Sequence, residues 1–451
     1  MLACVTPSDP VDSGEAGLAP SSDTGEPGPP EQGAGALPEV PDADDLDPSE
    51  NAVRVSLVAG ELDHLVGGIA YAGYGYNGTS PGPTIRANVG DTVTVEFANM
   101  LADSTTVHWH GLPVSNEMDG AAWVDSPVPS GAGFTYSFVV SRTGTFWYHP
   151  HIDVSRQVDL GLYGALVVAD PAEPVAERDL VIVLDAWGEF DASDPDHHEL
   201  PPNPQSVTWT LNGMVLPSLS LAKGERVRAR LLNASNTSYL ALDWPGARWI
   251  GGEQGLSGVA TEAIGVVLAP GNRREFEVYG SPTGADLSTA MWSAAGGAAI
   301  GPPRTLLTVG SDGESAQVEW PFHGLAASAN PTYTDLVYVF AGGGSEGEWL
   351  INGEAWPVVT PTAVSLGQSL VVEVRNLSET NHPFHLHGHR FEVLTIDGTP
   401  PAHQTWADTV DVAIRSAVRL RIVADNPGEW LVHCHILGHE DNGMMTLFNV
   451  N

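Results

Sequence analysis

The chain has few positive charges. Its 451 residues include 18 Lys and Arg against 56 Asp and Glu, and Lys223 is the only lysine. The net charge of −38 excludes nucleic acid and anionic membrane surfaces as partners, because both would be repelled. Long apolar runs are also absent, and no segment approaches the roughly 20 apolar residues that a membrane-spanning helix needs. The acidic surface would instead attract metal cations.

Cysteine is almost absent as well. The two cysteines are Cys4 and Cys434, so no internal disulfide can form if Cys434 binds a metal. A missing disulfide often indicates a reducing compartment, but a chain of this length can build a core that needs no covalent cross-link. The cysteine count therefore does not decide the compartment.

Histidine, by contrast, is concentrated in short clusters. The C-terminal cluster consists of His433, Cys434, His435, His439 and Met444. A thiolate, imidazoles and a weakly bound axial thioether are the ligand set of a blue copper centre. On an extended strand, the two neighbours of Cys434 face the opposite side. We therefore expect Cys434 to bind one copper while His433 and His435 reach others, so that electrons can pass between metal sites.

Three further clusters lie upstream and supply seven more histidines: His108, His110, His149, His151, His382, His385 and His387. A single His-x-His pair is weak evidence, because most such pairs are surface or packing residues. Here four clusters take ten of the sixteen histidines, together with one Cys and one Met. This set can ligate four coppers without a protein carboxylate.

The four motifs HWHG, WYHPH, HPFHLHGH and HCHILGHEDNGMM resemble those of the laccase-like multicopper oxidases. The resemblance covers roughly residues 52–451 with the motifs in the family's order, and the C-terminal motif is similar to that of periplasmic cuprous oxidases and bilirubin oxidases. It implies a type 1 copper that takes electrons one at a time from a reductant. It also implies a trinuclear cluster that reduces O2 to water.

The resemblance also implies which residue holds which copper. The type 1 copper would take His382, Cys434 and His439, with Met444 axial. The type 2 copper would take His108 and His385. The type 3 pair would divide the remaining six histidines into His110, His149 and His435 on one copper and His151, His387 and His433 on the other. Met445 is interpreted as a packing residue.

Two carboxylates match acidic positions that assist proton delivery in bacterial members of the family. They are Asp119, which follows the HWHG motif, and Glu440, which follows His439 directly. With 56 acids in the chain, either could instead be an ordinary surface carboxylate. Asp408 lies in another family-like segment and could orient a cluster histidine. His389 and His403 fall outside the ligand spacing.

The rest of the chain predicts an all-β fold. Gly90, Gly224 and Gly367 each precede an Asn by nine residues, at Asn99, Asn233 and Asn376, with alternating apolar strands between them. An Asn-Gly turn precedes each unit, at residues 77–78, 212–213 and 352–353. The repeat spacing predicts three consecutive β-sandwich domains; the resemblance makes them cupredoxin-like Greek-key domains.

We expect the domains to span residues 52–170, 171–320 and 321–451. The copper motifs fall in the first and third, so the trinuclear cluster should lie between them. The second domain should act as a spacer without copper ligands, since its adjacent His197 and His198 lie in an acidic loop.

Residues 1–51 have a different composition. They hold twelve Asp or Glu and no Lys or Arg, with abundant Pro, Gly and Ser. Such a segment buries too little apolar surface to offset its ordering entropy, and predicts a disordered tether. The opening Met-Leu-Ala-Cys resembles the end of a bacterial lipoprotein signal, which would place a lipid anchor on Cys4. The alternative is a chance cysteine in a disordered tail.

These observations predict an exported, monomeric laccase-type oxidase with four coppers, acting on a phenol or aromatic amine with O2 as acceptor. The alternative is a metallo-oxidase of Cu(I) or Fe(II). The seven Met form no Met-rich insert, which favours organic reductants, whereas the acidic surface favours metal ions. A copper-free structural protein or a copper store would not need every ligand in this Cys-bridged arrangement.

Overall fold

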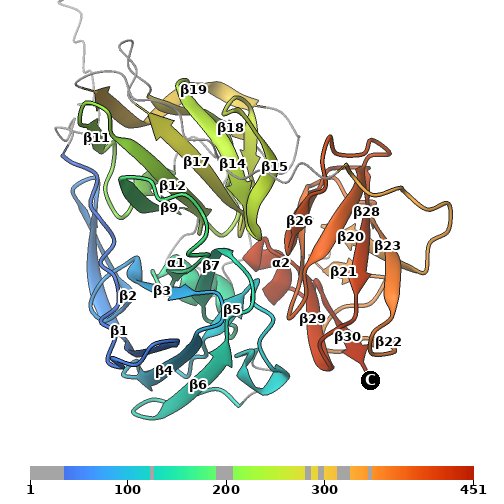
Figure 1. The fold of residues 1–451 in the computed structure, drawn as a ribbon. Coiled ribbons are helices and arrows are strands. Elements are labelled where there is room, and N and C mark those ends of the chain that lie inside the picture. The colour runs from blue at the N-terminus through green and yellow to red at the C-terminus, as the bar shows by residue number, and fades with distance from the viewer. Residues whose placement is uncertain are drawn as a thin grey trace, which may run out of the picture. The chain divides into compact units, whose positions relative to one another are not determined.

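The computed structural model describes residues 35–121, 126–188, 207–279, 286–292, 299–311, 326–343 and 348–451. Within these ranges the chain is nearly all β, and the strands form three pairs of sheets in chain order (Figure 1). Each pair encloses its own apolar core. The predicted all-β fold of three sandwiches is therefore confirmed.

The first sandwich is built from β1 to β8. One sheet has the order β2 (Ile69–Tyr76), β1 (Ala52–Val66), β4 (Thr92–Asn99) and β6 (Gly133–Val139). The other has the order β3 (Gly82–Asn88), β8 (Gly164–Ala169), β7 (Gly144–His149) and β5 (His108–His110). Alternate side chains of β4 are buried, as expected for a strand with one face on a core.

The second sandwich is built from β9 to β19. Its larger sheet has the order β10 (Thr208–Leu211), β9 (Arg178–Trp187), β12 (Arg226–Asn233), β17 (Arg273–Tyr279), β14 (Ala247–Gly252) and β15 (Gly255–Glu262). The other has the order β11 (Ser218–Leu221), β19 (Ala299–Ser311), β18 (Leu287–Trp292), β13 (Tyr239–Asp243) and β16 (Val266–Leu268).

The third sandwich is built from β20 to β30. One sheet has the order β21 (Trp349–Ile351), β20 (Leu336–Gly342), β23 (Ser369–Asn376), β28 (Ala417–Val423), β25 (Phe391–Ile396) and β26 (Trp406–Ala407). The other has the order β22 (Thr362–Val364), β30 (Met445–Val450), β29 (Gly428–Cys434), β24 (His382–Leu386) and β27 (Thr409–Val412). The proposed domain boundaries fall between β8 and β9 and between β19 and β20.

The same pairings recur in all three sandwiches. The first long strand pairs in parallel with the strand that follows the repeat glycine, as β1 with β4, β9 with β12 and β20 with β23. On the opposite sheet, parallel pairs form between β3 and β8, β11 and β19, and β22 and β30. The sequence repeat is therefore a repeat of topology.

The repeat asparagines explain why the motif recurs. Asn99, Asn233 and Asn376 are buried at the ends of β4, β12 and β23. Each donates two side-chain hydrogen bonds to backbone carbonyls and accepts one from the amide two residues ahead. A buried backbone group without a partner is costly, so one Asn stabilises the exit of each strand.

The Asn-Gly turns adopt the predicted conformation. Asn77, Asn212 and Asn352 have φ between 51 and 57°, and the glycines that follow them have φ between 74 and 79°. Positive φ at both central positions is the requirement of a tight hairpin turn that matches strand twist.

Residues 35–51 are packed against the sandwiches, although their composition predicts a tether. The Leu37 amide donates to the Ser218 carbonyl at 2.8 Å, and the Ala43 amide donates to the Thr84 carbonyl at 2.8 Å. Ser218 and Thr84 belong to β11 and β3, which are edge strands with unpaired backbone groups. Residues 35–51 form hydrogen bonds with these backbone groups, and amino-acid composition does not reveal that stabilisation. Residues 1–34, including Cys4, lie outside the described residues.

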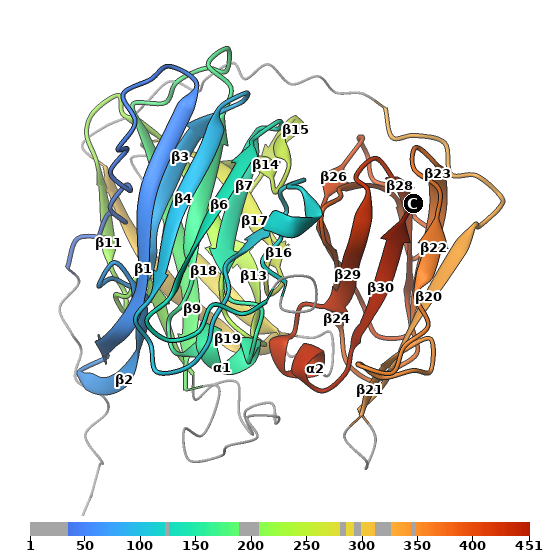
Figure 2. The same ribbon diagram turned by 90° about the horizontal axis from the view of Figure 1, so that it is seen from below.

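Two short helices lie where the first and third sandwiches meet. Helix α1 (Val154–Asp159) contacts helix α2 (Leu437–Asp441), and Figure 2 shows them adjacent. The Ser155 hydroxyl donates to the Asp441 carboxylate at 2.5 Å, which joins the two helices. A 3₁₀ turn, η1 (Asn116–Met118), precedes Asp119. Among the described residues, no helix is long and apolar enough to cross a membrane.

We expect Asn99→Ala to lower the free energy of unfolding by roughly 1–3 kcal/mol, because it removes two hydrogen bonds to backbone carbonyls and leaves the buried Leu101 amide without its acceptor. Thermal or denaturant unfolding measures the effect, and Asn88→Ala is a control because Asn88 is exposed. Equal stability of the two variants would contradict the role given to the repeat asparagine.

Candidate metal centre

Four strands carry the histidine clusters, two from the first sandwich and two from the third. In the first, β5 pairs with β7 so that His108 lies opposite His149. In the third, β24 pairs with β29 so that His385 lies opposite His433. Because alternate residues of a strand share a face, each cluster presents two imidazoles to the same space.

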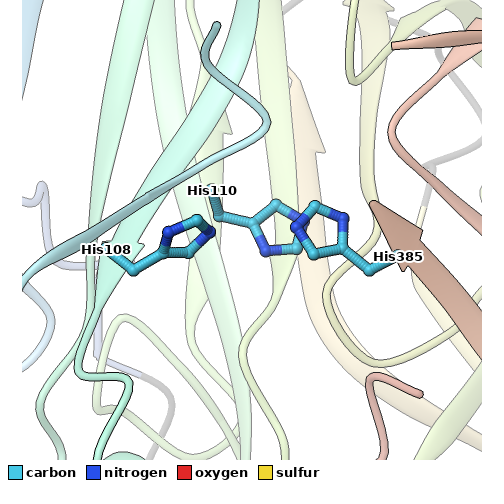
Figure 3. A group of neighbouring side chains, drawn as sticks. All are labelled: His108, His110 and His385. Carbon is cyan, nitrogen blue, oxygen red and sulfur yellow. The ribbon is translucent and has the colours of Figure 1, made fainter. Parts of the chain in front are cut away.

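Eight imidazoles from these strands and their flanking turns form one buried group. Its potential ligand atoms lie within 4.8 Å of one another in three sets: His108, His110 and His385; His110, His149 and His435; and His151, His387 and His433. In Figure 3, His108 and His385 approach from opposite sides, with His110 between them. The His110 and His385 rings stack with centroids 3.8 Å apart.

Hydrogen bonds hold the outer nitrogens of these rings. His108 Nδ1 donates to the Asp119 carbonyl at 2.8 Å, and His385 Nδ1 donates to the Asp408 carbonyl at 2.8 Å. His149 Nδ1 donates to the Pro150 carbonyl at 2.9 Å. A ring whose one nitrogen donates to a carbonyl presents the lone pair of the other nitrogen, which is how metal-binding histidines are oriented.

The inner nitrogens lack such partners. The Nε2 atoms of His108, His149 and His385 and both ring nitrogens of His435 are buried without a hydrogen-bond partner among the described residues. A buried polar atom left unpaired is costly. Several convergent lone pairs of this kind fit metal ions, and an all-imidazole set suits copper.

Burial also sets the protonation state of the cluster. It lowers the pKa of His435 to about 3 and that of His151 to about 4. It also holds the pKa values of His149 and His387 well below the usual value, with a further contribution from neighbouring imidazoles. These rings are neutral at pH 7, which is the form that binds metals.

Both sequence-predicted acids adjoin this group. The Asp119 carboxylate accepts from His387 Nδ1 at 2.7 Å, and Glu440 lies 2.9 Å from His433 Nδ1 and 3.4 Å from His151 Nε2. Both acids are buried. Burial disfavours charge at His433, but the Glu440 carboxylate outweighs it and raises the pKa of that imidazole. Neither acid is a surface carboxylate.

A second group lies on the other side of β29. Cys434 Sγ is 3.4 Å from His382 Nδ1 and 3.6 Å from His439 Nδ1, and the two nitrogens are 3.2 Å apart. Burial raises the pKa of the Cys434 thiol well above its usual range, so a bound metal must displace its proton. His433 and His435 belong to the eight-imidazole group, so adjacent residues of one strand enter two sites.

Both methionines of the C-terminal motif lie beside this strand. The Met444 side chain is buried in the same core cluster as Cys434, and the Met444 carbonyl accepts from the Cys434 amide at 3.2 Å. Met445 packs instead beside a small separate cluster that contains Leu431 and Leu447.

Other histidines have different environments. His389 Nδ1 donates to the His387 carbonyl at 3.0 Å, and its ring packs edge-on against Trp430. His403 belongs to none of the metal-binding groups found among the described residues. His197 and His198 lie outside the described residues.

The sequence did not single out Trp349 of β21. Its ring stacks on His439 with centroids 3.7 Å apart and planes 29° apart, and it meets the His382 ring at 5.3 Å. Trp349 is half-buried, whereas His439 is only 3% exposed. No local pattern marks this contact, because about ninety residues separate the two rings along the chain.

Comparison with known proteins agrees with this geometry. Sequence models of multicopper oxidases match residues 64–173 and residues 328–451. The multicopper oxidase MmcO of Mycobacterium tuberculosis is 31% identical over 422 residues, which cover 82% of each protein. Laccase-5 of Trametes versicolor is 27% identical over 475 residues, covering 87% of this chain and 88% of the relative.

Solved structures share the fold. A multicopper oxidase from Campylobacter jejuni, described as a metallo-oxidase, matches with a TM-score of 0.79 and 25% identity, covering 92% of this chain and 95% of that one. The expected cupredoxin-like architecture is thus confirmed. With its imidazole and thiolate groups assembled as described, the chain belongs to the multicopper oxidase family and is a copper-dependent oxidoreductase.

Proposed function

We propose that this protein oxidises a phenol or aromatic amine by single electrons and reduces O2 to water. Four phenols lose four electrons and four protons to give four phenoxyl radicals, and O2 takes up four electrons and four protons to give two waters. The observation that carries the proposal is the position of Cys434, which shares one group with His382 and His439 while both its chain neighbours enter the other.

The ligand roles expected from the sequence form part of this proposal. A type 1 copper would be held by His382, Cys434, His439 and Met444. His108 and His385 would hold a type 2 copper, and the six remaining histidines of the eight-imidazole group would hold a type 3 pair. Bound copper supplies the one-electron redox chemistry that imidazole and thiol side chains lack. The chain contributes a short covalent path from Cys434 to His433 and His435.

The two buried acids are proposed to hold the protons that O2 reduction consumes. Asp119 contacts His387 and Glu440 contacts His433, two neighbouring rings of the imidazole group whose Nε2 atoms are 3.0 Å apart. A carboxylate placed within hydrogen-bond reach of a reaction site can accept and return a proton at each turnover. Neither acid contacts the group around Cys434 among the described hydrogen bonds and ion pairs.

We therefore expect Glu440→Gln to slow reoxidation by O2 by roughly 100-fold, a typical loss for a proton-transfer group. Anaerobic reduction by substrate and the blue absorption should not change. Stopped-flow spectroscopy separates the two half-reactions, and Glu429→Gln serves as a control because Glu429 is exposed. Unchanged reoxidation would contradict the role in proton transfer.

The ring of Trp349 favours an aromatic reductant. Stacked on His439, it covers a ligand of the proposed type 1 site and is itself partly exposed. An aromatic molecule can stack on this indole and lie one ring away from the imidazole. Electron transfer needs such proximity, not a deep pocket.

Trp349→Ala should lower kcat/KM for a methoxyphenol roughly 2- to 10-fold, since a stacked aromatic pair contributes about 0.5–1.5 kcal/mol. Oxidation of Cu(I) should be little affected, and Trp349→Phe should retain most of the phenol activity. An equal loss of kcat/KM with both reductants would show that Trp349 only supports the copper site. A higher kcat/KM with the phenol would show that Trp349 blocks access of the reductant to His439.

A metal-ion reductant is the second candidate. The acidic surface favours cations, and the Campylobacter jejuni neighbour is described as a metallo-oxidase. Oxygen uptake by copper-loaded protein, with a methoxyphenol and Cu(I) side by side, tests the choice. Faster turnover of Cu(I) would replace the phenol assignment, and no uptake with either reductant would overturn the oxidase proposal.

Export is also proposed, since copper is available outside the cytoplasm. Lipid attachment at Cys4 and the monomeric state stay predictions of the sequence. Detergent phase partitioning of the protein expressed from its full gene tests the first, and light scattering tests the second.

A further inference from the structure

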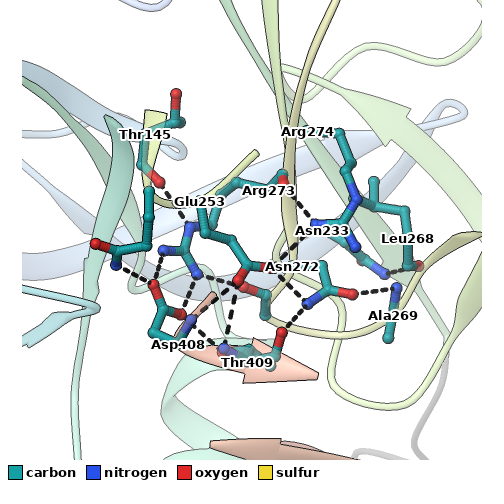
Figure 4. Close-up of polar contacts among 12 residues, drawn as sticks. Thr145, Asn233, Glu253, Leu268, Ala269, Asn272, Arg273, Arg274, Asp408 and Thr409 are labelled. Carbon is teal, nitrogen blue, oxygen red and sulfur yellow. Dashed lines mark hydrogen bonds and ion pairs between the residues drawn. The ribbon is translucent and has the colours of Figure 1, made fainter. Parts of the chain in front are cut away.

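The described part of the second sandwich contributes no histidine to either group, yet it reaches the eight-imidazole group. Two of its turns do so: the turn between β14 and β15, which carries Glu253 and Gln254, and the turn before β17, which leads into Arg273. Both meet Asp408 and Thr409 of the third sandwich (Figure 4). A spacer would not need buried polar side chains at this boundary.

Arg273 is the centre of these contacts. It is fully buried, and its two terminal nitrogens donate to the two oxygens of Asp408 at 2.8 and 2.6 Å. Its Nε donates to the Thr145 carbonyl of the first sandwich at 2.6 Å. The planar guanidinium thus binds a carboxylate in two places, a geometry that lysine cannot reproduce. One side chain joins all three sandwiches.

Glu253 holds the backbone of the same segment. Its carboxylate accepts from the amides of Asp408 and Thr409 at 3.2 and 3.3 Å. It also accepts from Asn272 at 2.7 Å. Gln254 adds a donor to the Asp408 carboxylate at 2.7 Å. Both the side chain and the backbone of Asp408 are therefore fixed from the second sandwich.

The segment held in this way orients two cluster imidazoles. The Asp408 carbonyl accepts from His385 Nδ1 at 2.8 Å. His110 Nε2 lies 2.9 Å from the Thr409 hydroxyl and 3.2 Å from the Asp408 carboxylate. Displacement of Asp408 and Thr409 would rotate both rings.

The backbone of the second sandwich also approaches the cluster closely. A Cβ placed on Gly271, whose φ is +78°, would lie 2.8 Å from the ring of His435. From the first sandwich, a Cβ on Gly111 would lie 2.4 Å from the Asp408 carboxylate. Both positions leave no room for a side chain, so the fit between the sandwiches is tight around these rings.

We propose that Arg273 and Glu253 are positioning residues, through which the second sandwich sets the orientation of His385 and His110. The inference rests on the proposed ligand roles, because His385 is assigned there to the type 2 copper. Loss of a group that orients a metal ligand typically weakens metal binding or activity by roughly 10- to 100-fold. The second sandwich is thereby a structural part of the copper site.

The test is the electron paramagnetic resonance spectrum and copper content of Arg273→Lys. We expect the type 2 copper to bind roughly 10- to 100-fold more weakly, or to show an altered hyperfine splitting, while the blue absorption stays unchanged. Glu253→Gln should change the same signal. Full copper loading with a wild-type type 2 spectrum in both variants would overturn the inference.

Arg228→Lys is the matched control. Arg228 is also buried in the second sandwich and binds the Glu275 carboxylate, without a described contact to Asp408. The Arg228→Lys variant should keep the wild-type type 2 spectrum. If both Arg variants show the same spectral change, the cause is general destabilisation and the inference is contradicted. If Arg273→Lys does not fold, Gln254→Ala replaces it in the test, because Gln254 is only half-buried. We expect a smaller change of the type 2 spectrum in the same direction.

These outcomes separate the inference from the proposed function. Wild-type protein with a type 2 signal but no O2 uptake would overturn the proposed oxidase reaction, while the comparison of variants would still decide the positioning role. Wild-type protein without a type 2 signal would overturn the ligand roles and the inference together.

Discussion

The structure depends on one constraint: imidazole nitrogens with unpaired lone pairs are buried between two sandwiches. Burial holds the pKa values of His149 and His387 well below the usual value, and the unpaired nitrogens of the described residues fit bound metal ions. Among the described residues, the Nε2 atoms of His108, His149 and His385 have no hydrogen-bond partner that could fix the orientation of their rings. The outer nitrogens of rings such as His108 and His385 therefore carry the hydrogen bonds that define the ring orientation.

Those outer bonds explain the polar residues around the site. Asp119, Glu440 and Asp408 are buried acids, and each contacts a cluster histidine. A buried carboxylate needs its own partners, and Asp408 obtains them from Arg273 of the second sandwich. The orientation of His110 and His385 therefore depends, through Asp408, on Arg273 of the second sandwich, whose described residues include none of the proposed ligands.

The same topology carries potential metal ligands in the third sandwich and positions them from outside in the second. In each sandwich a buried asparagine ends the strand after the repeat glycine, and a further strand follows. Six residues beyond Asn376 lies His382, whereas six residues beyond Asn233 lies Tyr239. The second sandwich keeps the backbone pattern with an apolar strand there, and it acts on the site through its turns.

Much of the architecture and the make-up of the site follow from the sequence alone. The Asn-Gly turns, the repeat asparagines and the His-x-His spacing are local patterns whose physical meaning does not depend on distant residues. The family resemblance added the expected assignment of histidines to coppers. In space, His110, His149 and His435 form one set and His151, His387 and His433 another, while His108 and His385 lie in a set that also contains His110.

Tertiary structure decided what no local pattern carries. The packing of the sandwiches decides which of the 56 acids are buried. It also brings Arg273 to Asp408, at a separation of 135 residues, and Trp349 to His439. The packing of residues 35–51 against β3 and β11 is of the same kind, since it satisfies edge-strand groups that exist only once the sheets have formed.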